Sequence, residues 1–149
     1  MRPSASRVRP GRSQASVHPS PPVYGPGTHS THTLNGQVVR TEVNGIAVLR
    51  GLPSTLFLGV CVHELGHAWL ALQGIRGLPG WAEEGFCELL SYQFYNELNT
   101  DESRYHATNI EKNSDPVYGE GFRRVRAIAE RMGFSRFVET LKTTKRMPM

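Results

Sequence analysis

The chain has 149 residues and 38% apolar residues, enough for one small domain rather than two. Its formal net charge is +4, but the first 40 residues hold five arginines and no acid, so the remainder is close to neutral. A basic surface for nucleic acid is therefore not expected in the folded part. The two cysteines, Cys61 and Cys87, are too few for a disulfide scaffold, and no apolar signal segment follows the N-terminus. We expect reduced thiols and a cytoplasmic location.

The chain divides by composition into a tail and a domain. Residues 1–34 are rich in Pro, Ser and Arg and poor in bulky apolar side chains, so we expect a disordered tail ahead of a domain at residues 35–149. Two β-branched runs, residues 37–43 and 46–50, flank Asn44-Gly45. Because Asn-Gly between such runs is a strong hairpin signal, we predict an N-terminal β-hairpin. Its second strand would form the edge of a substrate cleft.

Four helices are predicted after the hairpin. The first spans residues 54–72 and stops at Gly74, and the second spans residues 81–96. After a polar stretch, Asp115-Pro116 is typical of a helix start; that helix would end at Gly133, and a last one would begin at Ser135. Steps of three and four predict a buried stripe on the first helix. Its members are Leu58, Val62, Leu65, Trp69 and Leu72.

The first predicted helix contains a metal-binding pattern. His63-Glu64-Leu65-Gly66-His67 is an H-E-x-x-H sequence, and residues four apart lie on one helical face. Both imidazoles can therefore reach one Zn²⁺. Glu64 lies one step round the helix from His63, which suits a general base acting on water that the metal has acidified. The pattern is short, so its context has to support it.

The second predicted helix supplies the carboxylate that a catalytic zinc site still lacks. Three glutamates lie on it, at 83, 84 and 88. Glu84 and Glu88 share a face, so one can bind the metal while the other orients a histidine nitrogen. Glu83 is expected to point elsewhere into solvent, where an acid suits the helix start. Spacing alone favours Glu84 over Glu83 only modestly.

The same residues could in principle serve other metal chemistries. A di-iron carboxylate bundle needs two Glu-x-x-His motifs, and the sequence has one. A membrane-embedded protease needs further membrane-length segments, and no second one is present. Two histidines and one carboxylate also make the facial triad of a non-haem iron enzyme, although helical H-E-x-x-H favours zinc. A non-catalytic zinc-binding interaction module, or a truncated fragment of a longer regulator, stays open.

Several segments carry a family resemblance. The run at residues 81–86, Trp-Ala-Glu-Glu-Gly-Phe, resembles the glutamate-zincin pattern in which the Glu before Gly-Phe is the third zinc ligand, which assigns that role to Glu84. Residues 46–53, 63–70, 83–87 and 116–123 together resemble the C-terminal peptidase domain of the DA-one family, the ubiquitin-activated zinc peptidases of plant organ-size control. The resemblance implies ubiquitin or ubiquitin-pathway proteins as partners. It also implies a preceding LIM module, which two cysteines cannot build.

The sequence thus predicts a small zincin-like α+β domain, with an N-terminal β-hairpin followed by a mainly helical bundle that carries the H-E-x-x-H helix. We expect a zinc metallopeptidase that makes limited regulatory cuts in protein substrates, with one Zn²⁺ per chain on His63, His67 and Glu84. Glu64 would be the general base. Tyr118 is the first candidate for the donor to the oxyanion. The next candidates are Tyr92, Tyr95 and His106. No nucleic acid and no membrane partner is expected.

Overall fold

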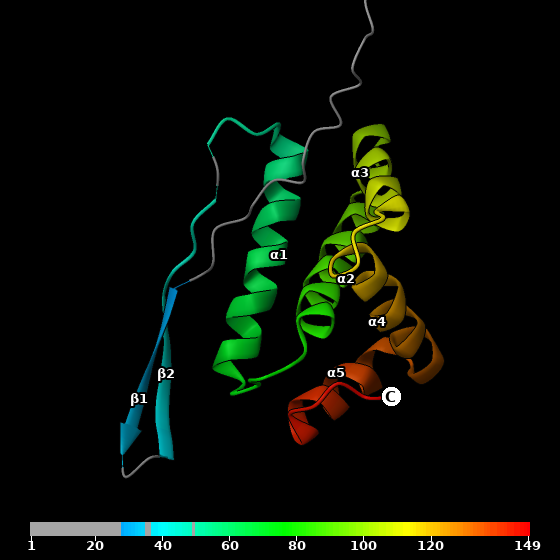
Figure 1. The fold of residues 1–149 in the computed structure, drawn as a ribbon. Helices are drawn as coiled ribbons and strands as arrows, with labels where there is room; N and C mark the ends of the chain where they lie inside the picture. The colour runs from blue at the N-terminus through cyan, green and yellow to red at the C-terminus, as the bar shows by residue number, and fades with distance from the viewer. Residues whose placement is uncertain (1–27, 35–36, 49) are drawn as a thin grey trace, which may run out of the picture.

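The computed structural model describes residues 28–34, 37–48 and 50–149. Within these residues the chain forms a two-stranded sheet followed by five helices, a small α+β domain (Figure 1). The strands are β1 (Thr28–Leu34) and β2 (Gln37–Gly45). The helices are α1 (Ser54–Leu72), α2 (Gly80–Leu98), α3 (Asp101–Lys112), α4 (Gly119–Met132) and α5 (Phe134–Thr144).

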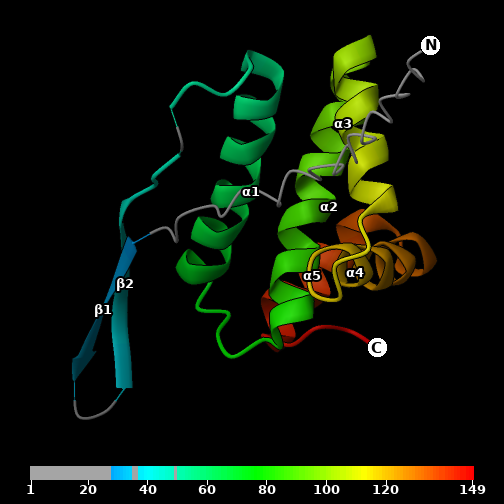
Figure 2. The same cartoon turned by 45° about the horizontal axis from the view of Figure 1, so that its top comes forward.

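Helix α2 is the centre of the arrangement. It contacts α1 on one side and α3 and α4 on the other, while the sheet lies against the opposite side of α1 (Figures 1 and 2). The main core fills the space among α2, α4 and α5 with three phenylalanines, Phe86, Phe122 and Phe137. Each is almost completely buried, and full burial of such a side chain contributes about 1.5–3 kcal/mol. Leu70 of α1 belongs to the same core, which therefore also joins α1 to α2.

The bounds of α1 agree with the prediction. Pro53 precedes the helix, and at its end the backbone N–H of Gly74 bonds to the carbonyl of Ala71 and that of Ile75 to the carbonyl of Leu70. This paired pattern is a Schellman motif, and it needs the left-handed conformation that Gly74 adopts with φ of +66°. By length and composition alone, α1 is also the one helix among the described residues that is apolar enough to cross a membrane.

The predicted buried stripe of α1 is wrong for three of its five members, whereas Trp69 packs on Phe86 with ring centroids 5.5 Å apart. Leu58, Leu65 and Leu72 are 47%, 56% and 56% exposed. The buried face carries small and polar residues instead, among them Gly59, His63, Glu64, Gly66, Leu70 and Ala71. The physical reason is the close approach of α2, which selects small side chains and the polar groups of one site rather than the most apolar face.

The predicted hairpin is also wrong in its position. Asn44 and Gly45 end strand β2 instead of forming a turn, and residues 46–48 are not a strand. Thr28–Leu34, placed in the tail by composition, pairs with β2 in antiparallel register, with Thr31 opposite Thr41. The connection between the strands falls at residues 35–36, which lie outside the described residues. The same Asn-Gly dipeptide occurs there in the sequence, so the local signal was ambiguous.

The remaining helices follow the prediction with one omission. Helices α2 and α5 begin within one residue of the expected positions, and α4 ends before Gly133, whose φ is +82°. The start of α4 is later than expected, although the Asp115 carboxylate accepts hydrogen bonds from the backbone of Val117 and Tyr118. Helix α3 was missed because it buries only Ser103 and Ala107. Its signal is a capping box at Thr100, where the third helical residue is Ser rather than Glu.

Candidate metal centre

Two glycines of α1, Gly59 and Gly66, let α2 approach closely. A Cβ on Gly66 would lie 2.8 Å from Sγ of Cys87, so only glycine allows the helices this approach. About two turns before Gly66 on α1, the carbonyl oxygen of Gly59 accepts a hydrogen bond of 2.8 Å from the hydroxyl of Ser91 on α2. The facing sides of the two helices are thereby fixed, and they carry the residues of the predicted site.

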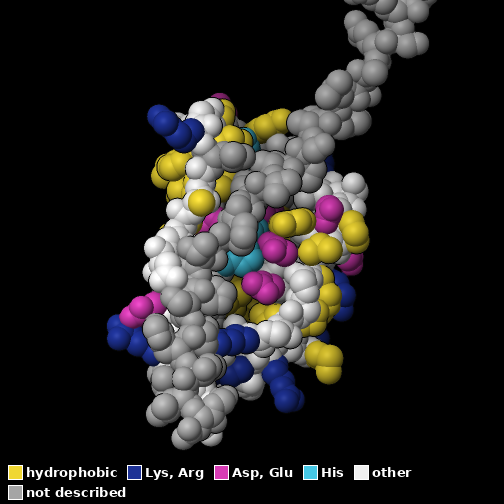
Figure 3. Space-filling view, turned by 60° about the vertical axis from the view of Figure 1, so that its left-hand side comes forward, with side chains coloured by type: hydrophobic (Ala, Val, Ile, Leu, Met, Phe, Trp, Pro, Cys, Tyr) yellow, Lys and Arg dark blue, Asp and Glu magenta, His cyan; other side chains and the backbone are white. Residues whose placement is uncertain are grey.

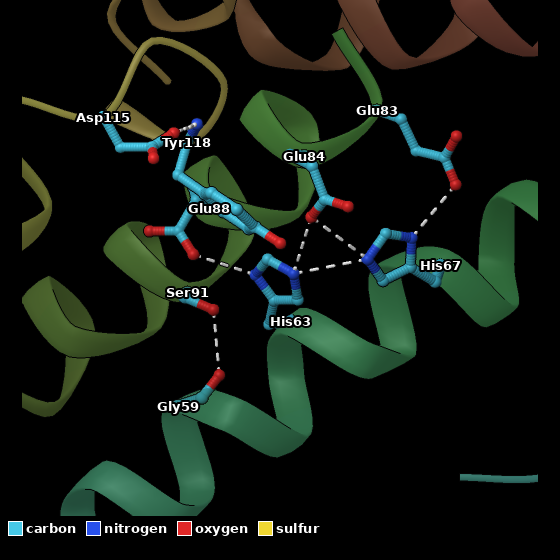
Figure 4. Close-up of polar contacts among 9 residues, drawn as sticks. All are labelled: Gly59, His63, His67, Glu83, Glu84, Glu88, Ser91, Asp115 and Tyr118. Atoms are coloured by element: carbon cyan, nitrogen blue, oxygen red, sulfur yellow. Dashed lines mark hydrogen bonds and ion pairs between the residues drawn. The ribbon is translucent and has the colours of Figure 1, made fainter. Parts of the chain in front are cut away.

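Three ligand atoms from these helices converge on one point. Nε2 of His63 lies 3.1 Å from Oε2 of Glu84 and 3.3 Å from Nε2 of His67, and the third side of the triangle, His67 to Glu84, is 3.4 Å (Figure 4). A tetrahedral zinc ion with bonds of about 2.0–2.1 Å holds its ligand atoms about 3.3–3.4 Å apart. The spacing of the three donor atoms therefore fits one face of a zinc tetrahedron.

The outer nitrogen of each imidazole meets a further carboxylate. Nδ1 of His63 lies 2.9 Å from Oε1 of Glu88, and Nδ1 of His67 lies 3.1 Å from Oε1 of Glu83 (Figure 4). Ionised carboxylates only accept hydrogen bonds, so a proton on each Nδ1 suits these two neighbours. In a neutral imidazole the proton on Nδ1 leaves Nε2 with a lone pair. Both lone pairs then point at the same place as the Glu84 oxygen, which is the donor set of a divalent cation.

The electrostatics of the cluster also favour a positive charge at its centre. Burial lowers the pKa of His67, but interactions with Cys87, Glu83 and Glu84 outweigh burial and raise the pKa to about 12. For Glu84, burial is outweighed by hydrogen bonds to the two imidazoles, which lower its pKa to about 2. Protons supply the positive charge here, and a metal ion would compete with them for the same nitrogen atoms.

Glu64 is buried beside this centre. Its side chain is 1% exposed, and its Oε2 has no hydrogen-bond partner in the described part of the chain. Burial raises the pKa of Glu64, while the neighbouring imidazoles of His63 and His67 oppose that rise. A buried carboxylate oxygen without a partner is costly in a finished structural site. The Glu64 carboxylate is suited to accept a proton from a bound water molecule or substrate.

Cys87 is a further donor at the same place. Its Sγ and one ligand atom each of His63 and His67 all lie within 4.8 Å of one another. The described chain therefore contains a His/His/Cys cluster able to hold a metal ion, beside the His/His/Glu triangle. Neither Cys87 nor the contact of Glu83 with His67 was predicted from the sequence. Glu83 was expected to point away into solvent, whereas it lies on the site.

Tyr118 reaches the site from the start of α4. Its ring centroid lies 6.3 Å from that of His63, and its hydroxyl is directed towards the space beside His63 and Glu84 (Figure 4). Helices α2 and α4 touch at Gly85 and Gly121, which brings the start of α4 close to the site. A Cβ on Gly85 would overlap the backbone of Gly121. Burial raises the pKa of Tyr118, and the negative charge of Glu84 raises it further. The phenol therefore keeps its proton at neutral pH.

The three reserve candidates have other partners. Tyr92 donates a hydrogen bond of 2.6 Å to Glu111, and Tyr95 packs against the ring of His106 with centroids 5.3 Å apart. On the molecular surface, histidine and acidic side chains gather in the middle of the face shown in Figure 3. Among the sequence candidates, the structure thus brings together His63, Glu64, His67, Glu84 and Tyr118.

The chain is similar to known proteins over most of its length. Residues 14–107 match the family model DA1-like, described as "Protein DA1". Over 136 residues it is 29% identical to Protein DA1 of Arabidopsis thaliana, covering 72% of this chain and 26% of that protein. It is 31% identical to Protein DA1-related 2 of the same plant, covering 74% of this chain and 27% of that protein. No solved structure matches.

A rice relative is more similar over a shorter stretch. The LIM domain-containing protein HDR3 of Oryza sativa subsp. japonica is 45% identical over 67 residues, which cover 44% of this chain and 13% of that protein. The chain spans about a quarter of the length of the first two relatives. The family match covers well over half of the 149 residues. The chain therefore belongs to the DA1-like family.

Proposed function

We propose that this chain is a zinc-dependent metallopeptidase domain of the zincin type, which hydrolyses peptide bonds in protein substrates. His63, His67 and Glu84 would hold one Zn²⁺, and Glu64 would act as the general base. The observation that carries the proposal is the triangle of Nε2, Nε2 and Oε2 atoms with sides of 3.1–3.4 Å. The carboxylate on the outer nitrogen of each imidazole supports the proposal, because metal-binding histidines usually donate their other N–H to such a group.

The zinc ion would polarise the scissile carbonyl and lower the pKa of a water molecule towards about 7. Glu64 would take a proton from that water and pass it to the leaving amine nitrogen. Burial supports this role, because a raised pKa brings the Glu64 carboxylate closer to the pH at which it must both accept and release a proton. The hydroxyl of Tyr118 would donate a hydrogen bond to the carbonyl oxygen as it gains negative charge.

The same observations bear on the non-catalytic alternative. A zinc site that serves only structure usually takes four protein ligands and has no use for a buried base. Here Glu64 is buried next to His63 in the chain, its Oε2 has no hydrogen-bond partner among the described residues, and Tyr118 approaches from the start of α4. Both features support hydrolysis over a purely structural or partner-binding role.

Substrate and regulation follow from family membership and are proposals as well. Limited cleavage of regulatory proteins and activation through ubiquitin are expected by analogy with the DA-one family, and a cytoplasmic location is expected from the two free thiols. Residues 46–48, which precede α1, do not form the predicted edge strand, so they provide no strand on which a substrate could pair.

The decisive experiment measures zinc content and peptidase activity on the same preparations. We expect one zinc per chain in the wild type and in Glu64→Gln, and its loss in His67→Ala, by elemental analysis. Glu64→Gln keeps the shape of the side chain and removes its basicity, so the variant should bind zinc normally and lose hydrolysis of unfolded protein substrates. Normal hydrolysis by Glu64→Gln would reject the assigned base. A folded wild type without stoichiometric zinc would reject the proposed function.

A further inference from the structure

Cys87 has features that packing alone does not require. It is 0% exposed and lies three residues after Glu84 on α2, so both side chains are on the face that meets α1. The sulfur packs on Gly66, the residue immediately before His67. Any side chain at position 66 would displace the sulfur.

The distances place the sulfur close to a coordinating position. Cys87 Sγ and one ring nitrogen each of His63 and His67 lie within 4.8 Å of one another. Sulfur and nitrogen ligands of one tetrahedral zinc ion are about 3.5 Å apart. The difference is little more than 1 Å, which a small change in one side-chain torsion can close. A thiolate is also a stronger zinc ligand than a carboxylate oxygen, since zinc is borderline soft.

We propose that Cys87 is a fourth protein ligand of the metal centre, completing a His63, His67, Glu84 and Cys87 set in a closed resting state. The inference rests on the proposed function, because it assigns a further ligand to the same ion. On binding, the thiol S–H bond breaks, its proton passes to solvent and the sulfur lone pair forms the bond to the metal, so no oxidant or reductant is needed.

A closed site has a functional consequence. Hydrolysis needs one position open to water, and four protein ligands leave none. The centre would hold its metal tightly until Cys87 withdraws, which α2 or a bound substrate can bring about by a shift of about 1 Å. Removal of the thiol should therefore weaken metal binding and raise turnover at saturating zinc.

Cobalt is the probe that reports on sulfur directly. Co²⁺ replaces zinc in tetrahedral sites, gives weak visible bands there, and gives a strong near-ultraviolet charge-transfer band only when a thiolate is bound. We would titrate Co²⁺ into the metal-free wild type and into Cys87→Ser under a phosphine reductant. Cys61→Ser is the matched control, because Cys61 is the other free cysteine and lies outside the cluster. Helix content by circular dichroism checks folding.

We expect the near-ultraviolet band in the wild type and in Cys61→Ser, its loss in Cys87→Ser, and a fall in Co²⁺ affinity of about tenfold or more for Cys87→Ser. If Cys87→Ser does not fold, a band retained by Cys61→Ser still assigns the sulfur to Cys87. Visible bands without the near-ultraviolet band in the wild type would overturn this inference and leave the proposed function standing. A wild type without any cobalt bands would overturn both.

Discussion

Nδ1 of His63 lies 2.9 Å from Oε1 of Glu88, and both side chains are nearly enclosed, at 2% and 11% exposure. The carboxylate favours a proton on Nδ1 of His63, and in the neutral ring Nε2 is then left with a lone pair for the point shared with His67 and Glu84. Glu88 thus sets the tautomer of a proposed ligand without reaching the metal position itself.

Glu88→Gln should therefore lower zinc affinity about 10–100-fold with the fold retained. A glutamine can still occupy the space, but it cannot make the charge-assisted bond that raises the basicity of the imidazole. Competition with a fluorescent zinc chelator measures the affinity. Glu97→Gln, an exposed change near the end of the same helix, is the control and should bind zinc as the wild type does. Equal affinities for the two variants would show that Glu88 has no orienting role.

Zinc should stabilise the protein more at pH 8 than at pH 5.5. In the metal-free protein the pKa of His67 is raised from 6.5 to about 12, so its stabilising contribution is complete below pH 6.5 and is lost as the pH rises towards 12. The pKa of Glu84 is lowered from 4.5 to about 2, so its contribution is complete above pH 4.5 and is lost as the pH falls towards 2. With respect to these two groups, the metal-free fold is most stable between pH 4.5 and 6.5.

Metal binding displaces these protons, so its affinity rises with pH. The increase in melting temperature on addition of zinc should accordingly grow from pH 5.5 to pH 8, as thermal unfolding with and without a chelator will show. His67→Ala supplies the comparison, since its melting temperature should not respond to zinc at either pH. A zinc-induced shift that is larger at pH 5.5 would contradict the assignment of His67 as a ligand.

Gly85→Ala should destabilise the fold by about 1–3 kcal/mol, because a Cβ would overlap the backbone of Gly121 where α2 crosses α4. The backbones cannot both stay in place, and Tyr118 moves with the start of α4. Gly80→Ala is a matched control on the same helix, since the nearest atom to its Cβ would be 3.9 Å away. Chemical denaturation of the two variants measures the difference. Equal stabilities would mean that the helices cross less closely than described.

The sequence predicted the α1 bounds because its signals are local. A proline precedes the helix, Gly74 supplies the left-handed residue at its end, and the apolar run between them is long. The histidine pair follows from helical spacing alone. The predicted position of the hairpin turn was wrong because Asn-Gly occurs twice. The choice between Asn35 and Asn44 depends on which flanking segment pairs with residues 37–45. Polar Thr28–Leu34 gave no periodic signal that would have favoured it.

The rest of the site depends on contacts between helices. The exposure of Leu65 and the burial of Glu64, its neighbour in sequence, are set by the packing of α2 on Gly66. Hydropathy ranks the two residues in the opposite order. The approach of Cys87 and of Glu83 to the histidines likewise follows from how two helices face each other, which no spacing within one helix determines.

That difference between neighbouring faces gives a stability test. Leu70→Ala should cost about 2–5 kcal/mol, because Leu70 is 3% exposed and belongs to the core. Leu65→Ala, the same change on the same helix, should shift the free energy of unfolding by no more than about 0.5 kcal/mol. Urea unfolding followed by circular dichroism compares them. A large loss at Leu65 would restore the predicted apolar stripe as a buried face.

Tyr118→Phe should lower kcat about 10²–10³-fold and leave KM and zinc content nearly unchanged. The ring stays in place beside His63, and only the hydrogen bond to the developing oxyanion is lost. Since burial and Glu84 raise the pKa of Tyr118, the wild-type phenol is a donor throughout the neutral range, and the ratio of the two kcat values should not vary between pH 6 and 8. Tyr105→Phe removes the hydroxyl of an exposed tyrosine on α3 and should keep full turnover. If Tyr118→Phe also keeps full turnover, the oxyanion has a different donor, and Tyr118 serves only to cover the imidazole of His63.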